Sequence, residues 1–238
     1  MVQMAQISNN HGIKISASLM CADWLSLGNE MKALEAAGAD SFHVDIMDGS
    51  FVQNFALNFW QVDSIRKATK LPLHVHLMAY EPARYLHRLS EAGVNTIVFH
   101  AEGCKNPDYA LREIKDHGIN AGVALNVETP MTILFDCLDL VDEILFMATR
   151  PGDMGQKFRP DVLPKMSKFV KTMKEQGFHP EISVDGHVGG ETIPLLAAEG
   201  ANIFIGGTTG LFTKDANPSN YKDKIKSMRD LAEKNYKW

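Results

Sequence analysis

The chain has 238 residues, of which 45% are hydrophobic and 22% are charged, as in an ordinary folded globular protein. Its formal net charge of -5 argues against a nucleic-acid partner, because nucleic-acid-binding surfaces are usually basic. No apolar run approaches the roughly 20 residues that a membrane-spanning helix needs, so we expect no membrane partner.

Short apolar or β-branched runs alternate with longer amphipathic stretches along the whole chain. The runs predict eight strands, which begin near residues 13, 41, 73, 95, 121, 142, 180 and 202. Four of the stretches between them end at glycine, as helices often do; they span residues 25–38, 81–93, 107–118 and 160–177. Eightfold alternation of strand and helix predicts an α/β fold, a (β/α)8 TIM barrel. No linker interrupts it, so we predict a single domain over residues 1–238.

A doubly wound open sheet would also explain the alternation of strands and helices. It would not bring residues from the second, third and seventh strands around one point so readily. Those three strands carry the polar residues that dominate the functional prediction, and the closed barrel is therefore the preferred fold.

Four polar side chains lie at the ends of otherwise apolar strands, namely His43, Asp45, His76 and Asp185. Side chains alternate faces along a strand, so His43 and Asp45 share one face. Buried polar groups are costly unless something binds them, and two imidazoles with two carboxylates suit zinc, manganese, iron or cobalt. One inward histidine alone is more often a hydrogen-bonded core residue, but the set of four predicts a divalent metal site. Magnesium is a further alternative.

Two more histidines accompany these candidates. His100 ends the fourth strand and is left outside the metal site, with a supporting role and a purely structural role both open. His74 shares a face with His76 and is predicted to be a buried structural residue.

Asp45 and Asp185 are also candidates for acid–base catalysis. A metal that holds a carbonyl and its neighbouring hydroxyl acidifies the C–H between them and stabilises the enediolate. One carboxylate can then remove a proton while the other delivers one to the opposite face, which inverts a stereocentre. The alternative is that the two aspartates only bind metal.

Three glycine-rich segments follow the last three strands. Residues 185–190 and 205–212 follow the seventh and eighth strands, where barrels of this kind usually bind phosphate, and we expect them just before helix N-termini. Residues 150–158 follow the sixth strand and have the length and glycine content of a loop that folds over substrate, although an ordinary connection would look the same. Three methionines at strand ends, Met47, Met78 and Met147, predict an apolar floor that excludes water.

The three cysteines, Cys21, Cys104 and Cys137, form no CxxC pair and no even disulfide framework. Free thiols fit a reducing compartment. The N-terminal stretch 1–12 has no basic start followed by an apolar core, so it does not resemble a signal peptide. We therefore expect a cytoplasmic protein.

With these residues identified, the chain resembles the ribulose-phosphate 3-epimerase family from about Lys14 to Phe212. The segments HVDIMDGSFVQN, HLM, AGVALN, PGxxGQ and VDG occur in the family's order. The resemblance implies a TIM barrel with a divalent metal, often zinc, on the four ligands named above, with Asp45 as proton acceptor and Asp185 as proton donor. It further implies that the substrate, a phosphorylated ketose, is contacted by Ser18, Met47, Met78, Met147, Gly155, Gly186, Gly207 and Thr208.

The chain departs from the family pattern at six positions, which hold Ala17, Gln53, Arg150, Asp153, Met154 and His187. His187 stands next to the expected phosphate, where a cationic ring would help to bind it and a bulky ring would shorten the pocket. The segments SLMCADWL and GGTTGLF are closer to the allulose-6-phosphate 3-epimerase branch of the family. The substrate prediction is therefore ribulose 5-phosphate, with allulose 6-phosphate as the alternative.

Three other classes of protein are alternatives to an epimerase. A Schiff-base aldolase needs a lysine at a strand end, and none of the eight predicted ends carries one. A metal-dependent hydrolase would share the ligands but leave the phosphate loops unexplained. In a non-catalytic sugar-phosphate-binding relative, the departures would have abolished turnover, yet both acid–base candidates are intact. Barrels of this kind often associate through exposed apolar helix residues, so we expect a homo-oligomer.

Overall fold

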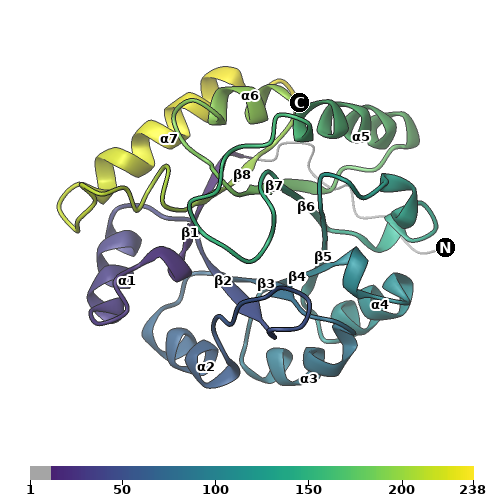
Figure 1. The fold of residues 1–238 in the computed structure, drawn as a ribbon, viewed down its shortest axis with the longest axis horizontal. Helices are drawn as coiled ribbons and strands as arrows, with labels where there is room; N and C mark the ends of the chain where they lie inside the picture. Colours follow the sequence, from purple (N-terminus) through teal and green to yellow (C-terminus); the bar gives the residue numbers. More distant parts are fainter. Residues whose placement is uncertain (1–11) are drawn as a thin grey trace.

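In the computed structural model, which describes residues 12–238, eight parallel strands form a closed barrel in the order β1 to β8 (Figure 1). Each strand lies within about two residues of its predicted start, and the predicted TIM barrel is confirmed. Residues 1–11, which include most of the stretch considered for a signal peptide, lie outside the described residues. The strands are β1 Lys14–Ser18, β2 Ser41–Met47, β3 Leu73–Met78, β4 Thr96–His100, β5 Asn120–Leu125, β6 Glu143–Met147, β7 Glu181–Asp185 and β8 Ile203–Gly206.

The outer ring of the barrel consists of seven α-helices within residues 12–238 (Figure 1). They are α1 Leu27–Ala36, α2 Phe59–Ala68, α3 Ala83–Glu91, α4 Pro107–Asp116, α5 Val162–Gln176, α6 Ile193–Ala198 and α7 Tyr221–Asn235. Short 3-10 turns, η1 Leu19–Cys21 and η2 Ala101–Gly103, follow β1 and β4.

The prediction of eight strand–helix units is wrong at one connection. Between β5 and β6 the chain forms two 3-10 turns, η3 Met131–Leu134 and η4 Leu138–Leu140, with no α-helix. Pro130 precedes the first turn, and the segment is rich in Thr and Asp, which favour turns over helix interiors. The barrel closes without this helix because the strands on either side still pair in parallel.

Local signals in the sequence account for several helix boundaries. The Asn58 side chain accepts hydrogen bonds from backbone N–H groups of the first turn of α2, and the Asn58 backbone N–H donates to Gln61 Oε1, which completes a capping box. The last helix turn of α5 is closed by Gly177, whose φ of 76° is readily adopted by glycine. These signals fix where the chain leaves each helix and enters the next strand.

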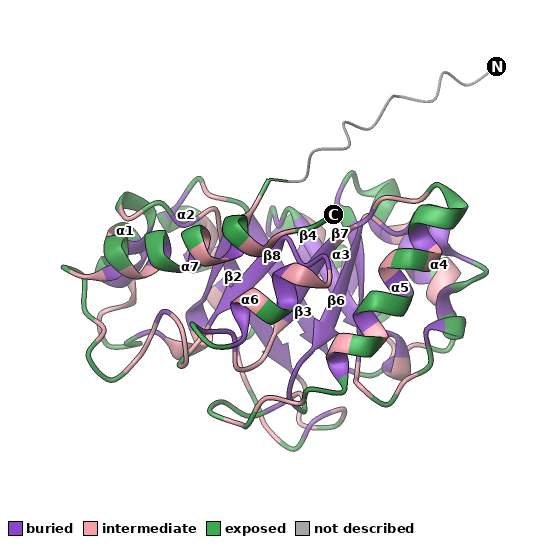
Figure 2. Ribbon diagram, turned by 90° about the horizontal axis from the view of Figure 1, so that it is seen from above, coloured by how far each residue is buried: buried purple, intermediate pink, exposed green. Residues whose placement is uncertain are grey.

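The hydrophobic core lies mainly between the strands and the surrounding helices. Figure 2 shows the strands almost wholly buried and the outward helix faces exposed. Inside the barrel, a smaller apolar cluster is formed by β4, β5, β6 and β8; its members are Val98, Ala124, Leu145, Met147, Ile203 and Ile205. Most of the polar interior side chains therefore gather on the side of β2, β3 and β7. Across residues 12–238, no helix is both long and apolar enough to cross a membrane.

The pairing of β2 with β3 stacks polar side chains in layers. His43 pairs with His74, and Asp45 pairs with His76 one layer nearer the C-terminal ends of the strands. On β7, Asp185 is the last strand residue and pairs with Met147. Asp45 and His76 therefore lie side by side, His43 lies one layer below them, and Asp185 stands at the C-terminal end of β7.

Candidate active site

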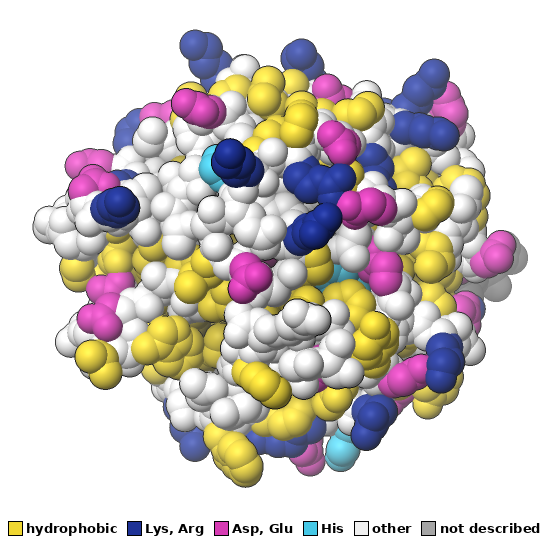
Figure 3. Space-filling view, in the orientation of Figure 1, with side chains coloured by type: hydrophobic (Ala, Val, Ile, Leu, Met, Phe, Trp, Pro, Cys, Tyr) yellow, Lys and Arg dark blue, Asp and Glu magenta, His cyan; other side chains and the backbone are white. Residues whose placement is uncertain are grey.

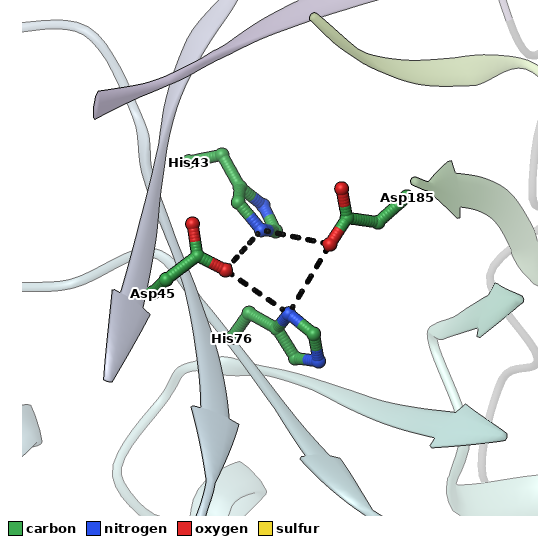
Figure 4. A group of neighbouring side chains, drawn as sticks. All are labelled: His43, Asp45, His76 and Asp185. Carbon is green, nitrogen blue, oxygen red and sulfur yellow. Dashed lines mark hydrogen bonds and ion pairs between the residues drawn. The ribbon is translucent and has the colours of Figure 1, made fainter. Parts of the chain in front are cut away.

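Four side chains from β2, β3 and β7 converge at the C-terminal end of the barrel (Figure 4). We call His43, Asp45, His76 and Asp185 the ligand cluster. Asp45 Oδ1 lies 3.2 Å from His43 Nε2 and 3.3 Å from His76 Nδ1. Asp185 Oδ2 lies 3.9 Å from His43 Nε2 and 3.6 Å from His76 Nδ1. All four ligand atoms lie within 4.8 Å of one another.

The geometry of the ligand cluster fits a divalent cation. A tetrahedral ion at about 2.0–2.1 Å from each ligand separates neighbouring ligand atoms by about 3.3 Å, close to the four distances above. The donor set of two imidazole nitrogens and two carboxylate oxygens is one that zinc and related ions accept. Because three of the four residues are buried and the fourth is half-buried, the two carboxylates strongly favour a positive charge between them.

The pKa shifts in the cluster also indicate that a positive charge is favoured between the two carboxylates. Burial lowers the pKa of His76, but the carboxylates of Asp185 and Asp45 outweigh burial and raise that pKa to about 9. Burial raises the pKa of Asp45, but the charges and hydrogen bonds of His43 and His76 hold that pKa well below its usual range. Asp45 is therefore ionised at neutral pH, and its negative charge is balanced by a proton or by a metal ion.

Within the cluster, only the two aspartates reach the adjoining cavity. Asp45 and Asp185 line it, whereas His43 and His76 are 0% exposed beneath it. Ser18, at the end of β1, donates a hydrogen bond of 3.1 Å to Asp45 Oδ2. One oxygen of Asp45 thus faces the ligand cluster while the other is held by Ser18, which fixes the orientation of the carboxylate.

The structure brings the predicted substrate-contacting residues together around this one cavity. They lie at the ends of six strands or in the loops that follow them: Ser18, Met47, Met78, Met147, Gly155, Gly186, His187, Gly207 and Thr208. The three methionines are at most 5% exposed. This arrangement places apolar side chains beside the carboxylates and glycine backbone at the other end.

The loop after β6 covers the cavity. In Figure 1 it crosses the mouth of the barrel, and residues 150–156 line the cavity beneath it. Asn54 donates a hydrogen bond of 2.8 Å to the carbonyl of Gly152, and His187 Nδ1 lies 2.7 Å from the carbonyl of Gln156. The cavity has a volume of about 60 Å³, far below the roughly 300–1,000 Å³ usual for small-molecule sites. We therefore expect this loop to move when substrate enters.

The expectation that both final glycine segments precede helix N-termini is wrong for β8. After Gly207 the chain forms a turn in which Leu211 and Phe212 donate to the Gly207 carbonyl, and α7 begins only at Tyr221. After β7, the six-residue helix α6 begins at Ile193. Any anion at this end of the cavity would depend on backbone N–H groups of the turns, since no helix dipole is aligned behind the β8 loop.

Four of the six departures from the family pattern lie around the cavity. Arg150, Asp153 and Met154 line it from the β6 loop, and His187 lines it from the β7 loop. His187 has a φ of 53°, a left-handed conformation that is uncommon for a residue with a side chain. Its ring is held by the β6 loop, so the position joins the two loops that surround the expected phosphate.

Sequence reasoning singled out His74 and His100 but missed the two glutamates that lie behind them. His74 and His100 each contact one of the two ligand histidines, and both then contact a glutamate, Glu143 or Glu102. The available signal was the strand period: Glu143 shares a face with Met147 on β6, and a charged residue on an inward face is costly without partners.

The cavity lining also bears on the rival enzyme classes. Among the described residues, no lysine lines the cavity, which leaves a Schiff-base aldolase without its nucleophile. On the face that surrounds the mouth, Lys and Arg side chains are interspersed with acidic and apolar ones (Figure 3).

Solved structures of other proteins share the barrel at low sequence identity. KGPDC from Streptococcus mutans superposes with a TM-score of 0.70 at 13% identity, covering 94% of this chain and 99% of that one. Tryptophan synthase from Mycobacterium tuberculosis gives a TM-score of 0.66 at 15% identity, covering 94% and 93%. Similarity at this level supports the fold alone.

Curated relatives are much closer in sequence. Ribulose-phosphate 3-epimerase from Bacillus subtilis (strain 168) is 41% identical over 197 residues, covering 82% of this chain and 91% of the relative. The enzyme of the same name from Synechocystis sp. is 38% identical over 220 residues, covering 92% and 94%. The sequence profile of the Ribulose-phosphate 3 epimerase family matches residues 14–212. The chain therefore belongs to the ribulose-phosphate 3-epimerase family of isomerases.

Proposed function

We propose that this chain is a divalent-metal-dependent ketose-phosphate 3-epimerase that interconverts ribulose 5-phosphate and xylulose 5-phosphate. The observation that carries the proposal is the ligand cluster, in which two carboxylates from non-neighbouring strands reach one cavity while the two imidazoles stay buried. Inversion at a carbon needs a proton acceptor on one face and a donor on the other. Asp45 on β2 and Asp185 on β7 supply that pair.

The ligand cluster would hold the metal ion through one atom from each residue. A bound divalent cation would polarise the substrate carbonyl and stabilise negative charge on the neighbouring oxygens. Zinc is the first choice because the ligand distances suit a tetrahedral ion; manganese, iron, cobalt and magnesium are alternatives.

The two aspartates carry out the proton transfers in this proposal. Asp45, held as a carboxylate by His43 and His76 and oriented by Ser18, accepts the C3 proton of ribulose 5-phosphate. Asp185, whose side chain is 22% exposed to the cavity, delivers a proton to the opposite face of the resulting enediolate. In the reverse reaction the two roles exchange.

The rest of the cavity protects and anchors the substrate. Met47, Met78 and Met147 exclude water and offer no acidic proton that would quench the enediolate. At the other end, backbone N–H groups of the loops after β6, β7 and β8 are proposed to bind the phosphate. The positions concerned are Gly155, Gly186, Gly207 and Thr208, with the His187 ring beside them.

We also propose a cytoplasmic homo-oligomer with no nucleic-acid or membrane partner, folded as one domain over residues 1–238. Cys21, Cys104 and Cys137 are free thiols, as is usual in a reducing compartment. Two large apolar side chains near the start of α2, Phe55 and Trp60, are each 79% exposed, which favours contact with another subunit.

A second candidate substrate is the hexulose allulose 6-phosphate, which would give fructose 6-phosphate by the same chemistry. The observation that favours it lies in the β1 and β8 loops, where the sequence is closer to the hexulose-phosphate branch. Cys21 and Thr209 from these two loops line the cavity together with the proposed phosphate contacts, so both loops form part of the proposed substrate site.

Solvent deuterium tests the proposed function. We expect zinc-loaded protein to exchange the C3 hydrogen of ribulose 5-phosphate in deuterium oxide and to produce the inverted epimer, followed by proton NMR. Faster reaction of allulose 6-phosphate under the same conditions would assign the hexulose branch. Binding of either sugar phosphate with neither exchange nor inversion would identify a non-catalytic sugar-phosphate-binding protein and contradict the proposal.

Removal of the His187 ring is expected to shift the enzyme toward the longer substrate. His187→Gly relieves the left-handed backbone and enlarges the phosphate end of the cavity. Because one extra carbon in a pocket is worth about 10–200-fold in discrimination, the ratio of kcat/KM for allulose 6-phosphate to that for ribulose 5-phosphate should rise about tenfold. An unchanged ratio would show that the ring does not set substrate length. Leu195→Ala, an exposed change on α6, serves as the control.

A further inference from the structure

Behind His43, a buried chain of hydrogen bonds leads away from the ligand cluster. His43 Nδ1 lies 2.8 Å from His74 Nδ1, and His74 Nε2 lies 2.7 Å from Glu143 Oε1. The hydroxyl of Ser183 donates to the same glutamate oxygen. All four side chains are buried, so each N–H has only these partners to satisfy it.

A second chain with the same order of residue types lies behind His76. His76 Nε2 lies 2.9 Å from His100 Nε2, and His100 Nδ1 lies 3.1 Å from Glu102 Oε2. The other oxygen of this glutamate accepts hydrogen bonds from the backbone N–H of Asn126 and from the Thr129 hydroxyl. The two chains diverge to different sides of the barrel, one to β6 and the other to the loop after β4, and share no residue.

Both glutamates are ionised acceptors. Burial raises the pKa of Glu102, but hydrogen bonds from His100, Thr129 and Asn126 outweigh burial and lower that pKa to about 2. Burial likewise raises the pKa of Glu143, but the charge and hydrogen bond of His74 and the Ser183 hydroxyl leave it below its usual range. The imidazole that faces each carboxylate must therefore donate an N–H.

In each chain, the proton that faces the glutamate determines where the other ring protons lie. When a metal ion instead of a proton balances the charges of Asp45 and Asp185, the imidazoles are neutral, and a neutral imidazole has one N–H and one acceptor nitrogen. If His74 donates through Nε2, its Nδ1 accepts, so His43 must donate through Nδ1. If His100 donates through Nδ1, its Nε2 accepts, so His76 must donate through Nε2.

The nitrogens left without protons are His43 Nε2 and His76 Nδ1. These are the two ring nitrogens that face Asp45 and Asp185 in Figure 4. His43 presents Nε2 and His76 presents Nδ1, so the two histidines need opposite tautomers. Each chain of hydrogen bonds leaves its own histidine in the tautomer that it needs. Each of the two separate chains of hydrogen bonds thus leaves one unprotonated ring nitrogen directed into the ligand cluster.

We propose that His74 with Glu143, and His100 with Glu102, are positioning residues that hold His43 and His76 in the tautomers that direct one unprotonated nitrogen each at the metal. This inference rests on the metal-dependent function proposed above. It gives a role to two buried histidines and two glutamates that do not line the cavity.

The tautomers can be observed directly in the unaltered, zinc-loaded protein. A long-range ¹H–¹⁵N correlation spectrum should show single ring protons on Nδ1 of His43, Nε2 of His74, Nε2 of His76 and Nδ1 of His100. A second ring proton on His74 or His100, or a proton on the opposite nitrogen of either, would overturn the assignment for that chain. This readout depends neither on activity nor on a variant that must fold.

Glutamine substitutions test whether the carboxylates set the tautomers. In Glu143→Gln the amide can donate as well as accept, so His74 and His43 lose their fixed tautomers while His76 and His100 keep theirs; Glu102→Gln should do the converse. Removal of such supporting partners typically costs 10–100-fold in metal affinity. We expect a loss of that size for zinc, measured by competition with a chromophoric chelator.

Glu30→Gln is the matched control, because Glu30 is buried and bonded to the Tyr221 hydroxyl on α7, away from the ligand cluster. It should lower the melting temperature without altering zinc affinity. Zinc affinity within threefold of the parent in both Glu143→Gln and Glu102→Gln would overturn the positioning roles. If the unaltered protein binds no zinc, cobalt or manganese, the metal-dependent function itself is wrong, and the two failures are therefore distinguishable.

Discussion

Asp185→Asn is expected to lower turnover of ribulose 5-phosphate by at least 10²–10⁴-fold, the usual contribution of a general acid or base. Asparagine keeps the shape of the side chain and an oxygen that can still face the ligand cluster, but it cannot deliver a proton. The side chain ends β7 and is 22% exposed to the cavity, so the barrel should fold as before. Steady-state kinetics, circular dichroism and metal content measure the three parts of this expectation.

The same variant separates a two-base mechanism from a one-base mechanism. With Asp45 intact, Asp185→Asn should still exchange the C3 hydrogen of ribulose 5-phosphate with deuterium oxide while inversion is lost. Asp45→Asn should show the opposite preference and exchange only xylulose 5-phosphate. If one aspartate served both faces, one variant would retain both reactions and the other would lose both.

The control for these variants is Asp63→Asn, an isosteric change at an aspartate that pairs with Arg88 between α2 and α3. It should leave turnover within about twofold of the parent, since surface ion pairs contribute roughly 0–1 kcal/mol to stability and neither residue lines the cavity. Turnover of Asp185→Asn within tenfold of the parent, at equal metal content, would remove Asp185 from acid–base catalysis.

The ligand cluster could be predicted from sequence because strand alternation and burial are local rules. His43 and Asp45 share a face of β2 at a spacing of two residues, and Asp185 ends an apolar strand. The barrel fold then predicts that these distant residues lie close together, since the C-terminal ends of all its strands meet at one mouth. Each predicted ligand was therefore placed by a rule that needs only its own strand and the fold.

Strand alternation marks Glu143 as an inward-facing residue, but it does not identify the hydrogen-bond partner of either glutamate. Glu143 contacts His74 across the barrel interior from β6 to β3, which depends on strand stagger and on side-chain rotamers. Glu102 lies outside any strand, in the turn after β4. The β5–β6 connection was mispredicted for a related reason: eightfold alternation is a global pattern, and a single connection can replace its helix by turns when strand pairing is already satisfied.

Removal of the metal is expected to abolish turnover and to destabilise the fold at the same time. Without a cation, two carboxylates face each other in a mostly buried site, and the raised pKa of His76, about 9, shows how strongly positive charge is favoured there. A ligand present at 1,000 times its Kd stabilises the folded state by about 4 kcal/mol. For a chain of this length, each kcal/mol corresponds to about 2–4 °C in Tm, so chelation should lower Tm by roughly 10 °C.

A variant that lacks one ligand separates the metal's contribution from a general effect of the chelator. His76→Ala removes an imidazole that is 0% exposed and lies beneath the cavity, so its Tm should start lower and respond to neither chelator nor added zinc. In the parent protein, zinc, manganese or cobalt should restore both Tm and turnover after chelation, and the ion that restores turnover at the lowest free concentration is the best candidate for the native one. A parent protein whose Tm and turnover both survive complete metal extraction, checked by elemental analysis, would show that the ligand cluster works as a hydrogen-bonded group. His43 and His76 alone would then have to stabilise the enediolate charge, which requires protonated imidazoles and hence a loss of activity as pH rises through the pKa of His76.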